Sequence, residues 1–506
     1  MTRSDVLIIG AGPTGLVLAL WLSHAGVKVR IIDKTDAPGT TSRALAVQAR
    51  TLELYRQLDL TDAVIGAGHK MPGVNLWVRG EQAAHLSLTD IGQSRTPYSF
   101  LEIYPQDQHE QLLIERLARF GVEVERHTEL TDFIDDQAMI TAYLKTPDGQ
   151  VQTCQARYLA GCDGARSTVR KALTTGFPGG TYSQLFYVAD VQALGPAVNG
   201  ELHVDLDEAD FLAVFPLAGE GRARLIGTVR GERAVDADAL AFADVSQRAI
   251  DQLKLEVLKV NWFSTYHVHH RVAEHFRAGN VFVLGDAAHV HSPAGGQGMN
   301  TGIGDAINLA WKLAAVLAGR ATPALLDSYE AERIGFARQL VATTDRVFSF
   351  ATADGWLANR VRTRLAPRVL PRIMALKAVR DFMFRTVSQI GVNYRNLPLS
   401  EGVAGHVHGG DRLPWAKVAG RDNFDSLHGG TWQIHVYGRA SEALLEWGAT
   451  HNVPVHIFSW HTVHEHAGFS RDAFYLMRPD TYVALAQPYG DPTVLDEYFR
   501  RRGITP

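Results

Sequence analysis

Cysteine is scarce in this 506-residue sequence, which contains only Cys154 and Cys162. Two cysteines cannot build a disulfide framework, and their spacing is not that of a CxxC pair. We therefore expect the chain to work in a reducing cytoplasm. Positive charge is not in excess either, since 50 Lys and Arg residues stand against 54 Asp and Glu residues, a net charge of −4. Nucleic acid and anionic membranes are accordingly not expected partners.

Apolar runs long enough to span a membrane are also missing. The longest run, Val6–Leu22, contains three glycines and a proline, and Asp5 stands where a signal peptide carries basic residues. With 46% hydrophobic and 21% charged residues, the composition is that of a globular protein. At about 150 residues per domain, the length predicts about three domains.

The first 33 residues predict a strand–turn–helix–strand unit of a parallel sheet. Its elements are expected over Asp5–Ile9, Gly10–Gly15, Leu16–Ala25 and Val27–Asp33. The turn has the GxGxxG pattern, whose glycines let the main chain approach a pyrophosphate at the start of the helix. Asp33 closes the second strand and can accept hydrogen bonds from a ribose. The pattern predicts a dinucleotide site but does not distinguish NAD from FAD.

Two later motifs also lie between a predicted strand and a predicted helix. Cys162–Arg170 contains Asp-Gly-Ala-Arg-Ser, a sequence that an Asp N-cap at a plain strand–helix junction would also explain. Gly285–Asn300 contains three clustered glycines ahead of a long helix expected over Met299–Leu317. An N-cap does not need those glycines, so they indicate a flat ligand held against the main chain.

The pattern of apolar residues divides the chain into four parts. We expect a nucleotide-binding domain over 1–72, 98–174 and 276–330, a β-sheet substrate domain over 73–97 and 175–275, a helical segment over 331–397, and a separate unit over 398–506. The last unit is expected to contain strands at 431–437 and 453–459, helices at 441–450 and 492–502, and a hairpin at 473–487. This order is thioredoxin-like, but CxxC is missing, so we expect a role in packing or in a homodimer.

In this order, GxGxxG, DGxxSxVR and GDAAH…PxGGQGMN resemble the motifs of the class A FAD-dependent aromatic hydroxylases. The sequence is most similar to the branch with a thioredoxin-like C-terminal domain, which includes 3-(3-hydroxyphenyl)propionate hydroxylase, polyketide hydroxylases and rifampicin monooxygenase. The resemblance covers essentially the whole chain. It implies an α/β fold in which a Rossmann-like FAD-binding domain is interleaved with the β-sheet substrate domain. It also implies FAD, NADPH or NADH, O₂ and a small aromatic substrate.

The resemblance implies a set of cofactor-binding residues. They are Gly10, Gly12, Gly15, Asp33, Arg43, Gln106, Asp163, Asp286, Gly295, Gly296, Gly298, Met299 and Asn300. The first four would hold the ADP half of FAD, and Asp163 belongs to a motif tied to both FAD and NAD(P)H. Asp286 would contact the ribityl or ribose part, and Pro293–Asn300 would line the isoalloxazine ring. The candidate catalytic residues are Pro293 and Arg224, the latter because some relatives place there an arginine that governs flavin movement.

The function implied is hydroxylation of a phenolic or polyketide-like ring by a C4a-hydroperoxyflavin, chemistry that belongs mainly to the cofactor. Free N–H groups at the start of the long helix would stabilise the anionic reduced flavin. Alternatives are an antibiotic- or drug-modifying monooxygenase, by N-hydroxylation or Baeyer–Villiger insertion, and a non-catalytic flavin-binding scaffold.

Several side chains remain ambiguous from the sequence. Phe186, Phe211 and Phe215 are candidate walls of a substrate pocket or plain core residues. The histidines of 266–271 and 460–466 lack accompanying cysteines or paired acids, so no metal is expected.

Overall fold

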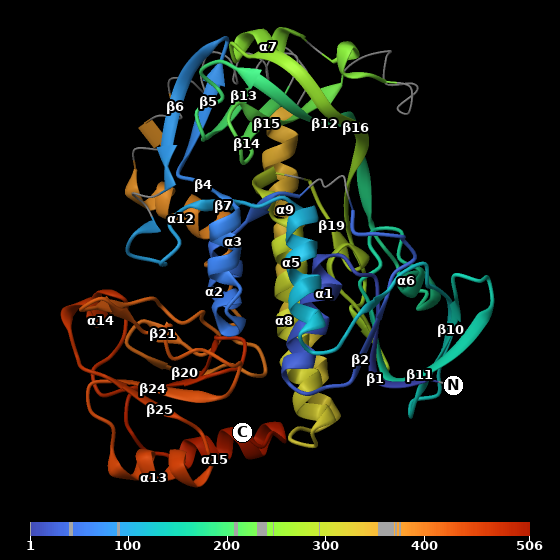
Figure 1. Ribbon diagram of the computed structural model, residues 1–506. Helices are drawn as coiled ribbons and strands as arrows, with labels where there is room; N and C mark the ends of the chain where they lie inside the picture. The colour runs from blue at the N-terminus through green and yellow to red at the C-terminus, as the bar shows by residue number, and fades with distance from the viewer. Residues whose placement is uncertain are drawn as a thin grey trace.

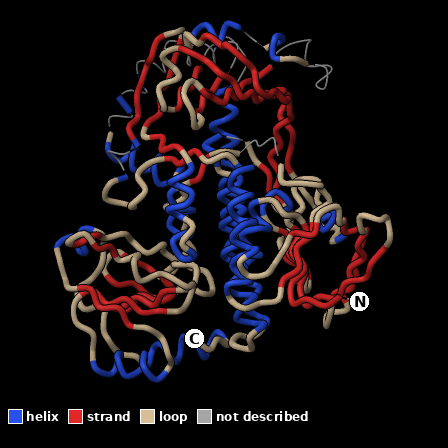
Figure 2. The backbone as a smooth tube through the Cα atoms, in the orientation of Figure 1, coloured by secondary structure: helices blue, strands red, loops and turns tan. Residues whose placement is uncertain are grey.

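The structure is a computed structural model that describes residues 2–39, 44–88, 92–206, 211–229, 240–245, 247–292, 294–352, 369, 372–373 and 376–506. Strands gather in separate sheets, and long helices run between them (Figure 1, Figure 2). In Figure 1 the N-terminal sheet lies at the right, a second large sheet at the top and the C-terminal unit at the lower left. Within the described ranges, each helix is too short or too polar to cross a membrane.

The N-terminal sheet brings the three glycine-containing motifs together. Its parallel strands are β1 (Thr2–Ile9), β2 (Val29–Ile32), β8 (Val124–Glu125), β11 (Val151–Gly161) and β18 (Val281–Val283). β1 lies between β2 and β11, and β18 pairs with the far side of β11. Because parallel strands end at the same edge of a sheet, the turns that follow β1, β11 and β18 meet there. Three antiparallel strands extend the sheet, namely β9 (Glu129–Asp135), β10 (Ile140–Lys145) and β17 (Arg277–Ala278).

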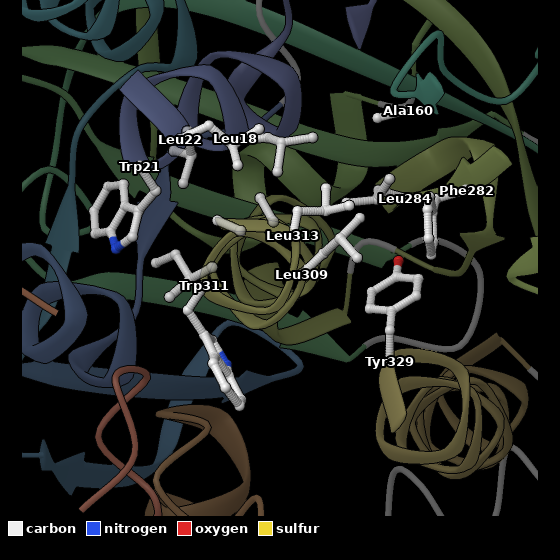
Figure 3. Close-up of a cluster of buried hydrophobic side chains, with 14 of the residues drawn as sticks. Leu18, Trp21, Leu22, Ala160, Phe282, Leu284, Leu309, Trp311, Leu313 and Tyr329 are labelled. Atoms are coloured by element: carbon white, nitrogen blue, oxygen red, sulfur yellow. The ribbon is translucent and has the colours of Figure 1, made fainter. Parts of the chain in front are cut away.

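Helix α1 (Pro13–His24) connects β1 to β2 and is buried from Gly15 to Leu22. A helix that is apolar on all sides has to be covered on all sides. α1 therefore packs between the sheet, α5 (Gln106–Ala118) and α8 (Gly298–Leu317). Figure 3 shows this core, with Leu18 and Leu22 of α1 near Leu309 and Leu313 of α8. The helix begins at Pro13, three residues before the predicted start at Leu16, because proline is well tolerated in the first turn of a helix.

The second sheet carries the far wall of the site. Its strands are β5 (Gly73–Val78), β6 (Glu81–Ser87), β12 (Gly179–Leu194), β13 (Leu202–Leu206), β14 (Phe211–Pro216), β15 (Arg222–Val229), β16 (Glu256–Val272) and β19 (His289–Val290). All of them except β19 lie in the two ranges predicted for a substrate domain. β19 comes from the range predicted for the nucleotide-binding domain, yet it pairs with β16. The chain after β18 therefore passes from one large sheet to the other.

The remaining elements before the C-terminal unit are short strands and helices and two longer helices. The short ones are β3 (Ala46–Val47), α2 (Ala49–Tyr55), α3 (Thr61–Ala67), β4 (His69–Met71), β7 (Leu101–Ile103), α6 (Thr168–Ala172) and α7 (Gln247–Gln252). The helical segment expected over 331–397 contains α9 (Asp327–Thr352), which begins before it, and α12 (Lys377–Val387). Pro367 and Pro371 of this segment lie outside the described residues.

The C-terminal unit contains every element predicted for it, in the predicted order. These are β24 (Gln433–Tyr437), α13 (Glu442–Thr450), β25 (Val455–Phe458), β26 (Phe474–Met477), β27 (Val483–Gln487) and α15 (Thr493–Arg502). Elements that we did not predict are β20 (Glu401–Ala404), β21 (Val407–His408), the pair β22 (Lys417–Val418) and β23 (Arg421–Asp422), and α14 (Thr462–His466). The assignment of this unit as a thioredoxin-like domain stays a prediction.

Buried ion pairs fasten the C-terminal unit to the rest of the chain. Arg478, in the turn after β26, lies 2.6 Å from Glu332 of α9, and both side chains are fully buried. Arg412 makes a similar buried pair with Glu53 of α2. The unit thus packs on its own chain, whereas the homodimer stays a prediction.

Candidate active site

The GxGxxG turn is packed directly against the turn after β11. Gly10 has a φ of +100°, and a Cβ atom on it would lie 2.4 Å from the main-chain oxygen of Cys162. A Cβ atom on Gly15 would lie 2.0 Å from the oxygen of Gly10. Gly12 differs, because nothing lies within 4 Å of its Cβ position and it lines a cavity. Two of the glycines therefore shape the turn, and the third leaves room for a ligand.

Asp33 braces the same turn in this structure. Its Oδ2 accepts a hydrogen bond from the N–H of Ala11 at 2.7 Å, and its Oδ1 accepts one from the N–H of Thr35 at 2.8 Å. Gln106, at the start of α5, lines the cavity and donates to Glu110. Arg43 lies outside the described residues.

Asp163 braces the start of helix α6. Its Oδ2 accepts from the N–H groups of Thr168 and Val169, at 2.7 and 3.2 Å, and Ser167 donates to its Oδ1. The N-cap residue is Ser167, whose hydroxyl accepts from the N–H of Arg170, so the junction differs from the Asp N-cap that the sequence had left open. The neighbouring Cys162 lines the cavity, and burial raises the pKa of its thiol well above the ordinary value, which favours the protonated thiol over the thiolate.

The turn after β18 rests on a buried charged cluster. Asp305 of α8 accepts from the N–H of Gly285, lies 2.7 Å from His289 Nε2 and accepts from Arg333 Nε at 2.6 Å. Burial alone would raise the pKa of Asp305, but the charges of Arg333 and His289 outweigh it and lower that pKa. Asp286 of this turn is exposed and lines the cavity.

Asn300 holds the glycine-rich segment in place. Its Oδ1 accepts from the N–H of Gln48 at 2.9 Å, and its Nδ2 donates to the oxygens of Ala46 and Gly296 at 2.8 and 2.9 Å. Gly295 and Gly296 both have positive φ angles, 77° and 61°. The segment leads into α8, whose first N–H groups have no partner within the helix. Pro293 lies outside the described residues.

A cavity of about 580 Å³ lies between the turns and the second sheet. On the side of the turns it is lined by Gly12, Gln106, Gly164, Asp286, Gly296, Gly298 and Met299. The opposite wall is formed by Phe215, Ile226, Trp262, Ser264, Tyr266, His267, Val268 and His269. Of the cofactor-binding residues that the resemblance implies, Gly10, Gly15, Asp33, Asp163, Gly295 and Asn300 support the turns and are not among the described residues of the lining.

Strand β16 supplies most of the opposite wall, which sequence reasoning missed. Trp262, Ser264, Tyr266 and Val268 alternate along β16, as side chains on one face of a strand must. That alternation in the sequence could have indicated a strand face that lines a pocket, but the histidines of 266–271 were considered only as metal ligands. Across the described residues, no group of His, Cys, Asp and Glu side chains has the arrangement of a metal site. Of the three phenylalanines considered, Phe215 lines the cavity, whereas Phe186 is a core residue with no exposed surface.

Arg224 lies behind this wall. Its Nε and Nη2 atoms donate to Asp190 at 2.6 and 2.8 Å, and its guanidinium carbon lies 5.7 Å from the ring centre of Trp262. The side chain is 3% exposed and is not among the described residues that line the cavity. In this structure Arg224 supports a wall residue.

Comparison with known proteins agrees with this geometry. Residues 3–344 match the family model described as an FAD binding domain. The chain is 37% identical over 419 residues to 6-methylpretetramide 4-monooxygenase of Streptomyces rimosus, covering 80% of this chain and 73% of that protein. The chain belongs to the class A FAD-dependent aromatic hydroxylases.

Two further comparisons cover more of the chain of this hydroxylase. It is 32% identical over 447 residues to pentachlorophenol 4-monooxygenase of Sphingobium chlorophenolicum, covering 87% of this chain and 80% of that protein. Its fold matches that of the flavin-dependent monooxygenase PieE, solved in complex with FAD and substrate, with a TM-score of 0.83 and 22% identity over 100% of this chain and 99% of the other.

The hydroxylase uses FAD, with NAD(P)H as the usual reductant of the family. The converging turns suit this cofactor, because the open face of Gly12 and the free N–H groups at the start of α8 can receive anionic groups and ring edges. When bound, FAD supplies the redox chemistry, taking a hydride from NAD(P)H and activating O₂. The chain itself has to hold the ring, keep water away and orient the substrate.

Proposed function

We propose that this hydroxylase inserts one oxygen atom of O₂ into a phenolic or polyketide-like aromatic ring. The second oxygen atom leaves as water, and NADPH or NADH supplies the two electrons. The observation that carries the proposal is the cavity, which has glycine-rich turns on one side and aromatic side chains on the other. Phe215, Trp262 and Tyr266 offer flat apolar surface to an aromatic ring. The named substrates of the two relatives, 6-methylpretetramide and pentachlorophenol, support this class.

Within this proposal the cofactor-binding residues act in two ways. Gly12, Gln106, Asp286, Gly298 and Met299 would touch FAD, because they line the cavity. Gly10, Gly15 and Asp33 would act by holding the turns in shape, and Asn300 would act by fixing the glycine-rich segment to Ala46 and Gln48. Asp33 would exchange its bond to Ala11 for a ribose hydroxyl if it contacts FAD directly. Asp163 would fix the turn after β11, near the place where NAD(P)H arrives.

The test is an assay of the purified FAD-loaded protein with a panel of phenols and polyketide aromatics. We expect a substrate to accelerate NADPH or NADH oxidation and to yield a product heavier by one oxygen atom on a ring carbon. The drug-modifying alternative predicts an N–O bond or an inserted ester oxygen in the product instead. If no aromatic accelerates the oxidation, and only hydrogen peroxide forms, the substrate class is wrong.

A further inference from the structure

Two adjacent residues of the cavity wall have buried polar atoms that lack a protein partner. They are His291 and Ser292, in the segment between β19 and the glycine-rich loop. Nε2 of His291 and Oγ of Ser292 are inaccessible to solvent and have no hydrogen-bond partner among the described residues. Ser292 is 0% exposed. Other buried side chains also have unpartnered atoms, but within the described chain these two are the ones that line this cavity.

Buried polar groups are hydrogen-bonded in the great majority of cases, because leaving one unpaired costs the free energy of its lost hydration. The polar side chain of Asn300, which lies beside the cavity in the glycine-rich segment, has protein partners for both its oxygen and its nitrogen. Two neighbouring unpaired atoms therefore indicate that their partner arrives with the molecule that fills the cavity.

The hydrogen-bonding character of His291 follows from its other ring nitrogen. Nδ1 lies 2.8 Å from the main-chain oxygen of Ser292. A carbonyl oxygen can only accept, so Nδ1 carries the proton and Nε2 presents a lone pair. Burial, together with the nearby His289, lowers the pKa of His291 to about 4, so the ring is neutral at pH 7. His291 is therefore an acceptor, and the hydroxyl of Ser292 can donate as well as accept.

The location of Nε2 places this acceptor at the glycine-rich segment. A Cβ atom on Gly298 would lie 3.8 Å from Nε2, so the ring edge faces the first residue of α8. This is the same side of the cavity on which Met299 and Gly296 lie. Ser292 lines the same cavity, so a ligand that fills the cavity would lie beside both residues.

We propose that Nε2 of His291 and Oγ of Ser292 form a hydroxyl-binding subsite of the cavity, in which His291 accepts a hydrogen bond from a ligand hydroxyl and Ser292 donates one to the same oxygen. The inference rests on the proposed function where the hydroxyl belongs to a phenolic substrate. A ribityl hydroxyl of FAD has the same chemistry, and the experiment below distinguishes the two sources.

The subsite positions the hydroxyl and does not remove its proton. A phenol has a pKa of about 10, which is about six units above that of His291, so transfer of the proton to Nε2 is strongly unfavourable. His291 is thus a positioning residue that selects ligands with a hydroxyl over ligands without one.

The test compares 2-naphthol with its methyl ether, 2-methoxynaphthalene, as probes of the FAD-loaded protein. Their dissociation constants are read from the change in the flavin absorption spectrum, and the dissociation constant of FAD is read from its fluorescence. The variants are His291→Phe, which keeps a ring but has no acceptor, His291→Gln, which restores an acceptor oxygen, and Ser292→Ala. His466→Phe, at an exposed position of the C-terminal unit, is the matched control.

If the hydroxyl is the substrate's, His291→Phe and Ser292→Ala weaken 2-naphthol binding by about tenfold, leave the ether within about twofold and leave FAD binding unchanged, while His291→Gln recovers part of the preference. If the hydroxyl is that of the ribityl chain, the dissociation constant of FAD rises by a similar factor and the preference between the probes is unchanged. Either result supports the subsite. It is overturned if FAD binding and the preference both stay at the wild-type level, or if both probes weaken equally.

Failure of the proposed function looks different. In that case wild-type protein and variants alike give no hydroxylated product with any phenol, whatever the binding constants are. Ser292→Ala removes a single oxygen atom, so it keeps the test valid if His291→Phe does not fold.

Discussion

Arg170 of α6 donates a hydrogen bond from Nη1 to the main-chain oxygen of Ala287, and the two atoms are 2.7 Å apart. The bond joins the turn after β11 to the turn after β18, although the residues are 117 positions apart in the sequence. Nη2 of Arg170 donates to the oxygen of Ala165, and its guanidinium lies 3.8 Å from the ring centre of Phe177. One side chain thus connects two motifs whose turns border the FAD cavity.

Arg170→Met should loosen both turns. It removes two hydrogen bonds from a charged donor, each worth about 1.5–3 kcal/mol, and leaves two oxygens unpaired. We expect a lower melting temperature and a clear loss of FAD during purification, measured by the flavin-to-protein absorbance ratio. The exposed neighbour Lys171→Met is the control and should match the wild type. Full flavin occupancy in Arg170→Met would contradict the role given to this bond.

Gly12→Ala and Gly15→Ala should fail in different ways. The Cβ atom of Gly12→Ala meets nothing in the protein, so the apoprotein should melt within about 2 °C of the wild type, while FAD binding falls by about tenfold or more. The Cβ atom of Gly15→Ala would lie 2.0 Å from the oxygen of Gly10, so the apoprotein itself should lose about 1–3 kcal/mol or more. Calorimetry of the apoproteins and FAD titration separate the two effects. Equal behaviour of the two variants would show that the turn is misassigned.

Asn300→Ala should release the glycine-rich segment. The change leaves the N–H of Gln48 and the oxygen of Ala46 unpaired in a buried place, at about 1–3 kcal/mol each. We expect weaker FAD binding and slower flavin reduction in stopped-flow measurements. Thr51→Val, which removes only one hydrogen bond to Oδ1 of Asn300, should have a smaller effect in the same direction. A larger effect of Thr51→Val would argue against Asn300 as the centre of this network.

Glu332 should make the docking of the C-terminal unit sensitive to acid. Burial alone would raise its pKa, but the charges of Arg478 and Lys312 outweigh burial and lower it. Because the folded-state pKa lies below the unfolded value of about 4.3, the stabilisation is complete above that value and is lost as the pH falls toward the folded-state pKa.

The corresponding variant is Glu332→Gln, which removes the carboxylate that pairs with Lys312 and leaves Arg478 paired with Asp480 alone among the described carboxylates. We expect the free energy of unfolding at pH 7 to fall by about 3–5 kcal/mol. We also expect the free energy of unfolding to depend less on pH than in the wild type. Urea denaturation at several values from roughly pH 3 to roughly pH 7 measures both effects. The control is Glu401→Gln, since the half-exposed Glu401 pairs with Arg501 at the surface and should contribute about 0–1 kcal/mol. Similar losses in the two variants would contradict the argument from burial.

Arg224→Lys tests whether Arg224 acts on the flavin or through Trp262. Lysine cannot reproduce the two-pronged bond to Asp190. If Arg224 supports the wall, the KM for the aromatic substrate rises while the rate of flavin reduction by NADPH, without substrate, stays unchanged. If the reduction rate falls while the KM for the aromatic substrate stays unchanged, Arg224 acts on the flavin, as the resemblance implied.

Features encoded by neighbouring residues could be predicted from the sequence. The βαβ unit, the glycine turns and the order of elements in the C-terminal unit depend on local apolar pattern and on backbone conformations that glycine or proline permit. The motifs also identified the family, and with it FAD. Boundaries moved by a few residues, as at Pro13, because capping decides them.

What each site residue does was decided only by the tertiary structure. Asp33 binds Ala11, Arg224 binds Asp190, and the wall of β16 faces the turns because two sheets pack across the cavity. These partners are far apart in the sequence or depend on which face of a strand is covered, and spacing along the chain carries neither kind of information. The sequence by itself therefore determined the family, the cofactor and the local turns, whereas the packing of the sheets determined which side chains meet the ligand and which hold the turns.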